Sequence, residues 1–432
     1  MEAKWRKSNM LIEFSATNYA SIKNKITLSA ETGAHLSRLR KTNTLEENNV
    51  SLLKSLLIFG PNGSGKSNLL DGLSLMKNLV LRNLPTVVEQ LNGLPFMLNV
   101  ENRNRPISFE VKFNYLEHTY SYAIEFYQNE IFSEKLSVFE KEKENIYFLR
   151  GKEVEEIIPE SLADTRRATK SNTLLLFNAQ AVNDSVSTEV FKWFAEDLIF
   201  VNETQPSSEL VKLIQNPEIK KELLNFLKFA DFNITDVNAI NVKIPEAPEQ
   251  IKKILEAIGS DAKFPAEGLQ LYTSHKVYDD SGEVVRTENF PLNMESKGTQ
   301  KIFLIALSII NAQISGNGKT LLFDEFDDSL HFELSKALVK LFNSETNLNQ
   351  FILTTHELQL LDQNLRTDQI YLMDKDFQGE SNLKSIFDFK DSRDSARYDV
   401  GFMKKYIAGR FGAVPQIDEE KMLAAIRIKG ED

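Results

Sequence analysis

The stretch GPNGSGKS at residues 60–67 constrains this chain more than any other part of its sequence. It fits the phosphate-loop pattern G-x-x-x-x-G-K-[ST], follows the apolar run SLLIF and precedes the helical pattern SNLLDGLSLMKNLV. A strand that turns through glycines into a helix directs backbone N–H groups and the positive end of the helix at phosphate oxygens. The sequence therefore predicts a nucleoside triphosphate site. The alternative, a glycine-rich turn with a chance lysine, does not explain the strand and helix on either side.

The residue types within this loop predict a division of roles. Lys66 is expected to reach the β- and γ-phosphates, and Ser67 to place its hydroxyl on the Mg²⁺ that neutralises them. The other predicted nucleotide-binding residues of the loop are Asn62, Gly63, Ser64 and Gly65. ATP and Mg²⁺ are therefore the expected ligands.

Composition narrows the class of protein. The chain has 432 residues, of which 42% are hydrophobic and 26% charged, so it can bury a substantial core. Its longest apolar run, IFLIALSII, is far shorter than the roughly 20 residues of a membrane-spanning helix, and the start of the chain has no apolar signal region. We expect a soluble, cytoplasmic protein. Cysteine is absent and the five histidines are scattered, which argues against disulfides and structural zinc.

The charge balance is acidic, with a net charge of −11. Nonspecific DNA coating depends on clustered lysine and arginine, so this balance argues mildly against it. Short basic groups, such as Arg103 with Arg105, are better interpreted as ordinary solvated surface.

The pattern along the chain predicts an α/β fold in three parts. In residues 1–150, MLIEFSATNYASIKNKITLSA predicts a strand pair, and alternating residues from 106 to 150 predict an antiparallel meander. Residues 286–432 alternate helices with short apolar strands, which indicates a parallel core sheet shared with the phosphate-loop strand. Residues 151–285, with helix-like stretches such as TEVFKWFAEDLIF, are predicted to form a mainly helical insertion outside that sheet.

Two strand ends in the C-terminal part carry polar residues suited to phosphate chemistry. The strand KTLLFDEF ends in Asp324 and Glu325, at the sheet edge where the crevice of an open α/β fold lies. Asp324 is predicted to hold Mg²⁺ through water, and Glu325 to orient and polarise the attacking water. The next strand, FILTTH, places His356 where it can donate to the γ-phosphate or report its presence.

The segment MESKGTQ presents a serine hydroxyl, a small residue and helix-terminal N–H groups together, through Ser296 and Gly298. From the residues alone, an anion-binding surface and a simple N-capped helix are equally good interpretations.

Taken in order, these motifs resemble the ABC-type head of SMC-like ATPases. In particular the chain is similar to bacterial ATP-binding proteins of the abortive-infection and PARIS (AriA) type, which are related to the OLD-family ATPases. In that resemblance GPNGSGKS is the Walker A, LLFDEF the Walker B with Glu325 as catalytic glutamate, SKG the signature, DDSLH the D-loop region and TTH the switch histidine. The stretch YIAGRFGAVPQI, from Tyr406, is similar to the ending of this family.

The resemblance implies how the parts work together. In such heads ATP lies between the Walker A of one subunit and the signature of the other, so the chain is expected to act as a homodimer or a higher assembly of dimers. The function implied is a slow regulatory ATPase of anti-phage defence, which senses a phage-derived trigger and controls a separately encoded toxic effector, a TOPRIM-type nuclease. The alternative is a DNA repair or recombination ATPase of the RecF or SMC-like kind that clamps DNA.

Overall fold

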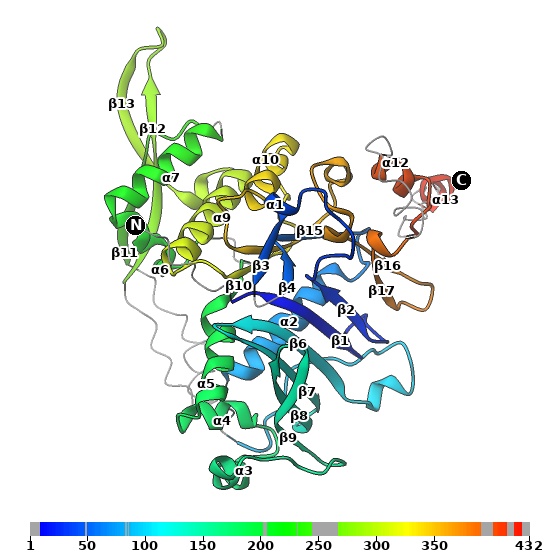
Figure 1. The fold of residues 1–432 in the computed structure, drawn as a ribbon. Coiled ribbons are helices and arrows are strands. Elements are labelled where there is room, and N and C mark those ends of the chain that lie inside the picture. The colour runs from blue at the N-terminus through cyan, green and yellow to red at the C-terminus, as the bar shows by residue number, and fades with distance from the viewer. Residues whose placement is uncertain are drawn as a thin grey trace, which may run out of the picture. The chain divides into compact units, whose positions relative to one another are not determined.

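The computed structural model resolves the chain into two compact units (Figure 1). The first comprises residues 1–200, 318–327 and 335–432, and the second residues 201–317 and 328–334. Within them, the structure describes residues 9–47, 50–82, 84, 86–201, 205–230, 232–243, 267–389, 401–412 and 419–425. The three-part division at residues 150 and 285 stays a prediction.

The first unit contains a six-stranded antiparallel sheet in the order β2-β1-β6-β7-β8-β9. Its strands are β1 (Leu11–Thr17), β2 (Ile26–Ser29), β6 (Ile107–Tyr115), β7 (His118–Tyr127), β8 (Glu130–Glu140) and β9 (Lys143–Gly151). In β6 the alternate residues Ile107, Phe109 and Val111 are buried while their neighbours are half exposed, the period of two that the sequence shows. The predicted strand pair and meander are both confirmed, and they belong to one sheet.

A second six-stranded sheet of the same unit has the order β10-β14-β15-β5-β16-β17. Its strands are β5 (Ser55–Phe59), β10 (Leu198–Phe200), β14 (Thr320–Phe323), β15 (Gln350–Thr355), β16 (Ile370–Lys375) and β17 (Ser381–Ser385). The first five positions in this order run parallel, and β17 is antiparallel to β16. The prediction that two distant α/β stretches share one core sheet is therefore confirmed. Together with the antiparallel sheet, it makes the mixed architecture expected of an ABC-type P-loop ATPase head.

Both faces of the parallel sheet are covered. Helix α2 (Lys66–Leu81) contributes Leu69 and Met76 to a core that also contains Ile58 of β5 and Phe109 of β6, so this helix joins the two sheets. On the opposite face, Phe342 of α10 (Phe332–Phe342) stacks on Phe351 of β15 at 4.1 Å. Sheets buried on both faces require continuous apolar strands, which explains why every residue of β5 is buried.

One predicted helix is split. The stretch TEVFKWFAEDLIF forms α5 (Ser185–Lys192), one π turn at Trp193–Asp197, and then β10. Trp193 stacks on Phe113 at 3.9 Å, and Leu198–Phe200 pairs in parallel with β14. The helical pattern ends early because the free edge of β14 accepts these apolar residues. An edge strand of the core sheet therefore comes from the expected insertion.

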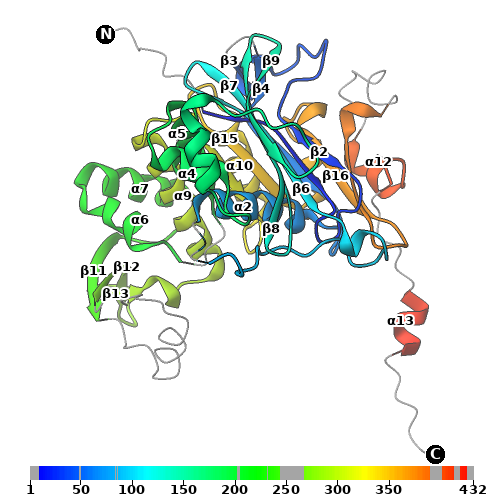
Figure 2. The same cartoon turned by 90° about the horizontal axis from the view of Figure 1, so that it is seen from below.

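Smaller elements complete the first unit. Strands β3 (Thr44–Glu47) and β4 (Val50–Leu53) pair with each other, and α4 (Leu175–Ala181) packs on both α2 and α5 (Figure 2). The other helices in the described part of this unit are α1 (Arg40–Asn43), α3 (Ala163–Ala168), α12 (Phe402–Ile407) and α13 (Glu419–Ala425).

The second unit combines a three-stranded antiparallel sheet with helices. The strands are β11 (Asp236–Lys243), β12 (Glu267–Tyr278) and β13 (Val284–Pro291), and the helices are α6 (Ser208–Lys212), α7 (Pro217–Phe229) and α9 (Lys297–Ile314). Pro217 is the first residue of α7, a position that suits proline because a helix start needs no N–H there. Among the described helices, α9 included, none is long and apolar enough to span a membrane.

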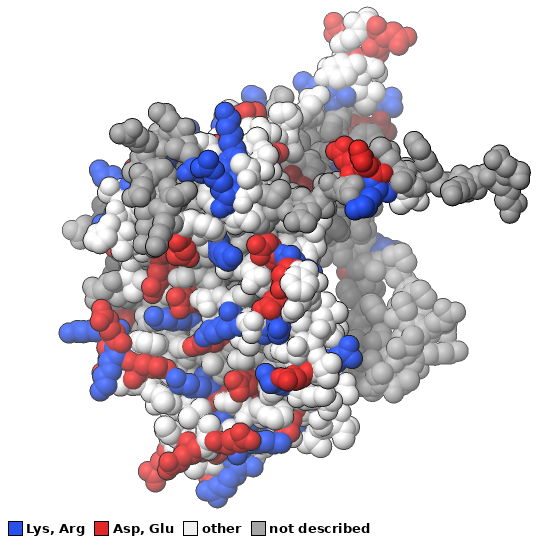
Figure 3. Space-filling model, turned by 90° about the vertical axis from the view of Figure 1, so that its right-hand side faces the viewer, with Lys and Arg blue, Asp and Glu red and all other residues white. Residues whose placement is uncertain are grey.

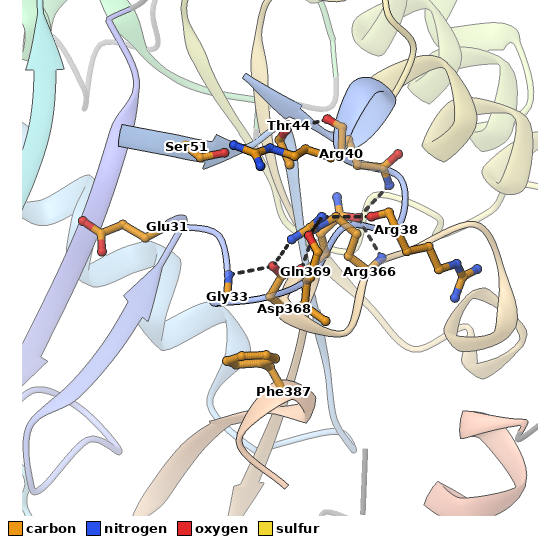
Figure 4. A network of polar contacts seen from close by, with 12 residues as sticks. Glu31, Gly33, Arg38, Arg40, Thr44, Ser51, Arg366, Asp368, Gln369 and Phe387 are labelled. Atoms are coloured by element: carbon orange, nitrogen blue, oxygen red, sulfur yellow. Dashed lines mark hydrogen bonds and ion pairs between the residues drawn. The ribbon is translucent and has the colours of Figure 1, made fainter. Parts of the chain in front are cut away.

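A buried ion pair fastens the segment after β2 to the start of β16 (Figure 4). The guanidinium of Arg366 donates to both carboxylate oxygens of Asp368, at 2.7 and 3.0 Å, and to the carbonyls of Leu36 and Arg38. Asp368 also accepts from the backbone N–H of Gly33 at 2.8 Å. These contacts fix a segment that otherwise has little regular structure.

A second buried carboxylate links three elements of the same unit. Glu134 of β8 is fully buried and accepts from Arg150 of β9 at 2.7 Å and from the hydroxyl of Tyr122 at 2.8 Å. Its two oxygens also accept the first backbone N–H groups of α4, from Leu175 at 2.7 Å and Leu176 at 2.9 Å. One side chain thus balances a buried cation and caps a helix start.

Replacing Glu134 with alanine is expected to lower the free energy of unfolding by about 3–5 kcal/mol, because Arg150 would become an unpaired buried charge. Urea denaturation followed by circular dichroism measures this loss. The matched control is Glu130→Ala, which removes an exposed ion pair with Lys152 and is expected to cost about 0–1 kcal/mol. Equal losses for the two variants would contradict this account of Glu134.

Candidate functional site

The phosphate loop lies where β5 ends and α2 begins, as predicted. Lys66 is only 5% exposed, and its ammonium donates to the carbonyls of Gly60 at 2.8 Å and Pro61 at 3.1 Å. Asn62 and Gly63 are exposed at the tip of the loop. The loop therefore wraps around the lysine while its tip stays open to solvent.

Gly65, the residue before α2, is confined by both its backbone and its neighbours. Its φ of +105° is one that residues with a Cβ rarely adopt. A Cβ there would also meet the hydroxyl oxygens of Ser21 and Ser381. Only glycine fits this position, which lets Lys66 and Ser67 begin the helix directly behind the loop.

The two predicted acidic residues follow β14 and are held by the neighbouring strand. The hydroxyl of Thr354 on β15 donates to the carboxylate of Asp324 and accepts from the backbone N–H of Glu325 at 2.7 Å. Glu325 has a φ of +47°, an uncommon conformation for a residue with a long side chain. Uncommon backbone conformations of this kind cluster at functional sites, because the surrounding contacts must hold them in place.

His356 lies between the lysine and the glutamate. Because β15 sits between β14 and β5 in the sheet, its end brings His356 Nδ1 to 3.5 Å from Lys66 Nζ, and His356 Nε2 to 3.5 Å from Glu325 Oε1. An ammonium can only donate, so Nδ1 is the accepting nitrogen in this arrangement, and the proton on Nε2 faces the carboxylate. The three predicted side chains thus form one continuous polar row.

The electrostatics of the site balance a buried cation against several acids. Burial lowers the pKa of Lys66, while the nearby carboxylates of Asp324, Glu325 and Asp327 act in the opposite direction. Partial burial and the charge of Asp324 raise the pKa of Asp71, which lies one helical turn after Ser67 on α2. This excess of carboxylates suits a site that takes up a metal cation.

The residues fit a nucleotide with Mg²⁺. The hydroxyl of Ser64 is buried inside the loop without any hydrogen-bond partner, and the ammonium of Lys66 contacts carbonyls of its own loop and the imidazole of His356. Within the described ranges, no three histidine or acidic side chains gather as a metal site. Mg²⁺ bound here would therefore depend on Ser67, Asp324, phosphate oxygens and water, the ligand set this ion commonly takes beside phosphates.

The SKG segment belongs to the second unit. Ser296 caps α9, because its side-chain oxygen accepts from the backbone N–H of Thr299 at 3.1 Å, and it is exposed. Gly298 lies against the DDSLH segment: a Cβ at Gly298 would be 2.5 Å from the carbonyl oxygen of Ser329. The two segments are therefore in contact, which explains the small residue.

Sequence reasoning missed the residues that position the acids. Thr354 holds Asp324 and Glu325, and the hydroxyl of Thr355 donates to Asp327 at 2.7 Å. Asp71 was missed as well. The signals were present, since two threonines directly precede His356 in FILTTH and Asp71 follows Ser67 by four residues, the spacing of one helix face.

Residues 56–362, well over half of the chain, match the family described as "AAA domain, putative AbiEii toxin, Type IV TA system". The chain belongs to this AbiEii-type AAA family. The match spans the phosphate loop, both acids and His356, so the residues brought together here lie inside the family domain. The chain therefore has the fold of a nucleotide-binding P-loop ATPase.

Among solved structures, the chain is similar to an SMC head bound to the C-terminal winged-helix domain of ScpA, at 15% identity and a TM-score of 0.40, over 89% of this chain and 99% of that one. The SMC head domain of Thermotoga maritima matches at 13% identity and 0.38, over 87% and 98%. An SMC head with an extended coiled coil, bound to the C-terminal domain of ScpA derived from Pyrococcus furiosus, matches at 13% and 0.37, over 87% and 96%. A search of the curated proteins gave no match.

Lys66→Met is expected to weaken Mg²⁺–ATP binding by about 100-fold or more, because charge-assisted hydrogen bonds to phosphate are lost. Titration calorimetry measures the affinity. Lys77→Met is the matched control on the same helix, where the ammonium of Lys77 donates to the carbonyl of Leu198 at 2.6 Å. This control should keep the wild-type affinity. Unchanged affinity in Lys66→Met would refute the assignment of the loop.

Proposed function

We propose that this chain is a slow regulatory ATPase, in which bound ATP closes a homodimer and hydrolysis reopens it. The observation that carries the proposal is the row of Lys66, His356 and Glu325 at one edge of the parallel sheet. These are the groups needed to bind a γ-phosphate, to sense it and to direct water at it. Turnover is expected near or below about 1 s⁻¹, the low end for enzymes.

In the proposed reaction the protein contributes mainly position and charge. Mg²⁺, held by Ser67 and Asp324, would supply neutralisation of the phosphate charge. Lys66 would exchange its loop carbonyls for phosphate oxygens, and Glu325 would accept a proton from the attacking water. His356 Nε2 would hold the Glu325 carboxylate in place. The two 3.5 Å separations are those of a site that tightens only when substrate is bound.

The dimer is proposed because the chain carries a second phosphate-binding element in its other unit. Ser296 offers an exposed hydroxyl at the start of α9, a helix long enough to have a substantial dipole. In the proposed dimer, Ser296 and Gly298 of one subunit meet the γ-phosphate bound by Lys66 of the other. ATP then acts as a switch because it binds the closed dimer more tightly than the open one.

A role in defence against phage is proposed from the family. The description of the matching family names a toxin of a toxin–antitoxin system, and the motif order resembles the PARIS (AriA) type. We propose that the ATPase senses a phage-derived trigger and holds or releases a separately encoded effector, a TOPRIM-type nuclease. A neighbouring open reading frame for such a nuclease would support this role.

DNA clamping remains the second candidate, and one feature favours it. The segment fixed by Arg366 carries the exposed residues His35, Arg38 and Lys41. Arg38 and Arg40 are drawn in Figure 4, and Arg40 pairs with Glu46. Against it, acidic and basic side chains are interspersed over the face drawn in Figure 3. A DNA clamp would show ATP hydrolysis that is stimulated by duplex DNA and falls steeply with salt.

Glu325→Gln is expected to keep ATP affinity within about twofold but to lower kcat by about 100-fold or more, because the amide cannot accept the proton. With Mg²⁺–ATP this variant should accumulate as a dimer in mass photometry. Glu140→Gln, an exposed acid at the end of β8 in the antiparallel sheet, serves as the control and should turn over normally. Normal turnover by Glu325→Gln would show that Glu325 is not the base.

Mixing two inactive variants tests whether the site is shared between subunits. Lys66→Ala and Ser296→Ala are each expected to be inactive alone, whereas an equimolar mixture contains heterodimers with one intact site. With random pairing and independent sites, the mixture should recover about a quarter of wild-type turnover. No recovery, or full activity of Ser296→Ala alone, would exclude the shared site while leaving ATP binding by Lys66 intact.

A further inference from the structure

Three polar side chains from distant segments meet behind the phosphate loop. The amide of Asn68 on α2 donates to the hydroxyl of Ser21 at 2.7 Å, and the hydroxyls of Ser21 and Ser381 are 2.7 Å apart. Ser381 on β17 is also 2.6 Å from the carbonyl oxygen of Ser64 in the loop. All four residues belong to the first unit, and none of these contacts involves the predicted phosphate-binding atoms.

Ser381 is the donor in both of its side-chain contacts, to the hydroxyl of Ser21 and to the carbonyl of Ser64. A carbonyl can only accept and a hydroxyl carries one proton, so the Ser381 proton is shared between these two acceptors. The Ser21 oxygen accepts from both Asn68 and Ser381. The three contacts therefore join Asn68, Ser21, Ser381 and the Ser64 carbonyl into one network. This network begins on α2 at Asn68, directly after Ser67, and ends in the loop at Ser64, directly before Gly65.

The turn that carries Ser21 is itself firmly held. Asn18 and Ala20 both have positive φ values, 54° and 49°. The buried side chain of Asn18 compensates for this strain: its amide donates to the carbonyls of Asn102 at 3.0 Å and Arg105 at 2.9 Å, and its oxygen accepts from the N–H of Phe96 at 3.1 Å. A strained turn held by several bonds indicates that its geometry serves a purpose.

We propose that Ser381 and Ser21 are positioning residues that keep the phosphate loop in its binding shape before nucleotide arrives. The Ser381 hydroxyl orients the peptide between Ser64 and Gly65, so that its N–H points away from Ser381, toward the bound phosphate. The hydroxyls of Ser21 and Ser381 also fill the space in which a Cβ of Gly65 would lie. This inference rests on the proposed nucleotide site and deepens it.

Preorganisation of this kind predicts a particular kinetic pattern. A loop that must be ordered at the moment of binding costs affinity for ATP and ADP alike, because both place phosphates in it. Glu325 and His356, the proposed water-directing residues, follow strands β14 and β15, and Glu325 is held by Thr354 rather than by Ser381. Loss of Ser381 should therefore raise KM and leave kcat unchanged.

The test compares serine-to-alanine variants that remove the same atoms. Ser381→Ala is expected to weaken binding of a fluorescent ADP derivative about tenfold, and Ser21→Ala less, since Ser381 can still donate to Ser64. Ser55→Ala is the matched control. Ser55 is fully buried at the start of β5, donates to Asn343 at 3.0 Å and accepts from Gln369 at 2.9 Å. It should lower the melting temperature as much as Ser381→Ala but keep the wild-type affinity.

The inference is overturned if Ser381→Ala binds as tightly as the wild type, or if Ser55→Ala weakens binding equally, since the effect would then be one of general stability. A fall in kcat at unchanged KM would also overturn it. If the wild-type protein itself does not bind the probe, the proposed function fails instead, so the two failures are distinguishable.

Discussion

The site depends on the parallel pairing of β15 with both β5 and β14. Parallel neighbours end at the same edge of a sheet, so the residues that follow these three strands must lie side by side. The phosphate loop, His356 and Glu325 are therefore neighbours because of strand order, although 290 positions separate Lys66 from His356. The same pairing lets Thr354, inside β15, hydrogen-bond to both acids after β14. A change of register in this one strand would displace His356 and break the contacts of Thr354 with both acids.

Local patterns predicted the elements well, because the spacing of apolar residues in the sequence matches the face that each strand or helix buries. The phosphate loop, the acidic strand end and the histidine were all predictable, since each is a short motif beside a strong apolar strand. Contacts between distant segments were not. Nothing in the sequence near Ser381 points to Ser64, and a helical pattern continues through Leu198, where only the free edge of β14 makes a strand more favourable. A prediction made from a short stretch of sequence cannot detect contacts with distant segments that favour a strand over a helix.

Two uncommon backbone conformations frame the site. Glu325 and Gly65 both have positive φ, but the chain handles them differently. At Gly65 glycine removes the cost, and two hydroxyls pack against it. At Glu325 a long side chain is kept despite the positive φ, and the Thr354 hydroxyl accepts from the backbone N–H and so stabilises this conformation. The contrast supports a chemical role for the Glu325 carboxylate. If this position had no such role, glycine or asparagine would adopt the same backbone conformation at a lower cost in free energy.

The two interpretations of Ser296, a helix cap and an anion-binding residue, are compatible with each other. As a cap, its side-chain oxygen accepts from the Thr299 N–H and so uses only a lone pair. The cap does not use the hydroxyl proton. The Ser296 oxygen lies 2.8 Å from the Thr299 hydroxyl oxygen, and either hydroxyl can be the donor. The cap fixes the position of the oxygen, and the helix dipole favours an anion beside it. Capping of α9 therefore leaves the Ser296 hydroxyl able to donate, which the proposed dimer requires.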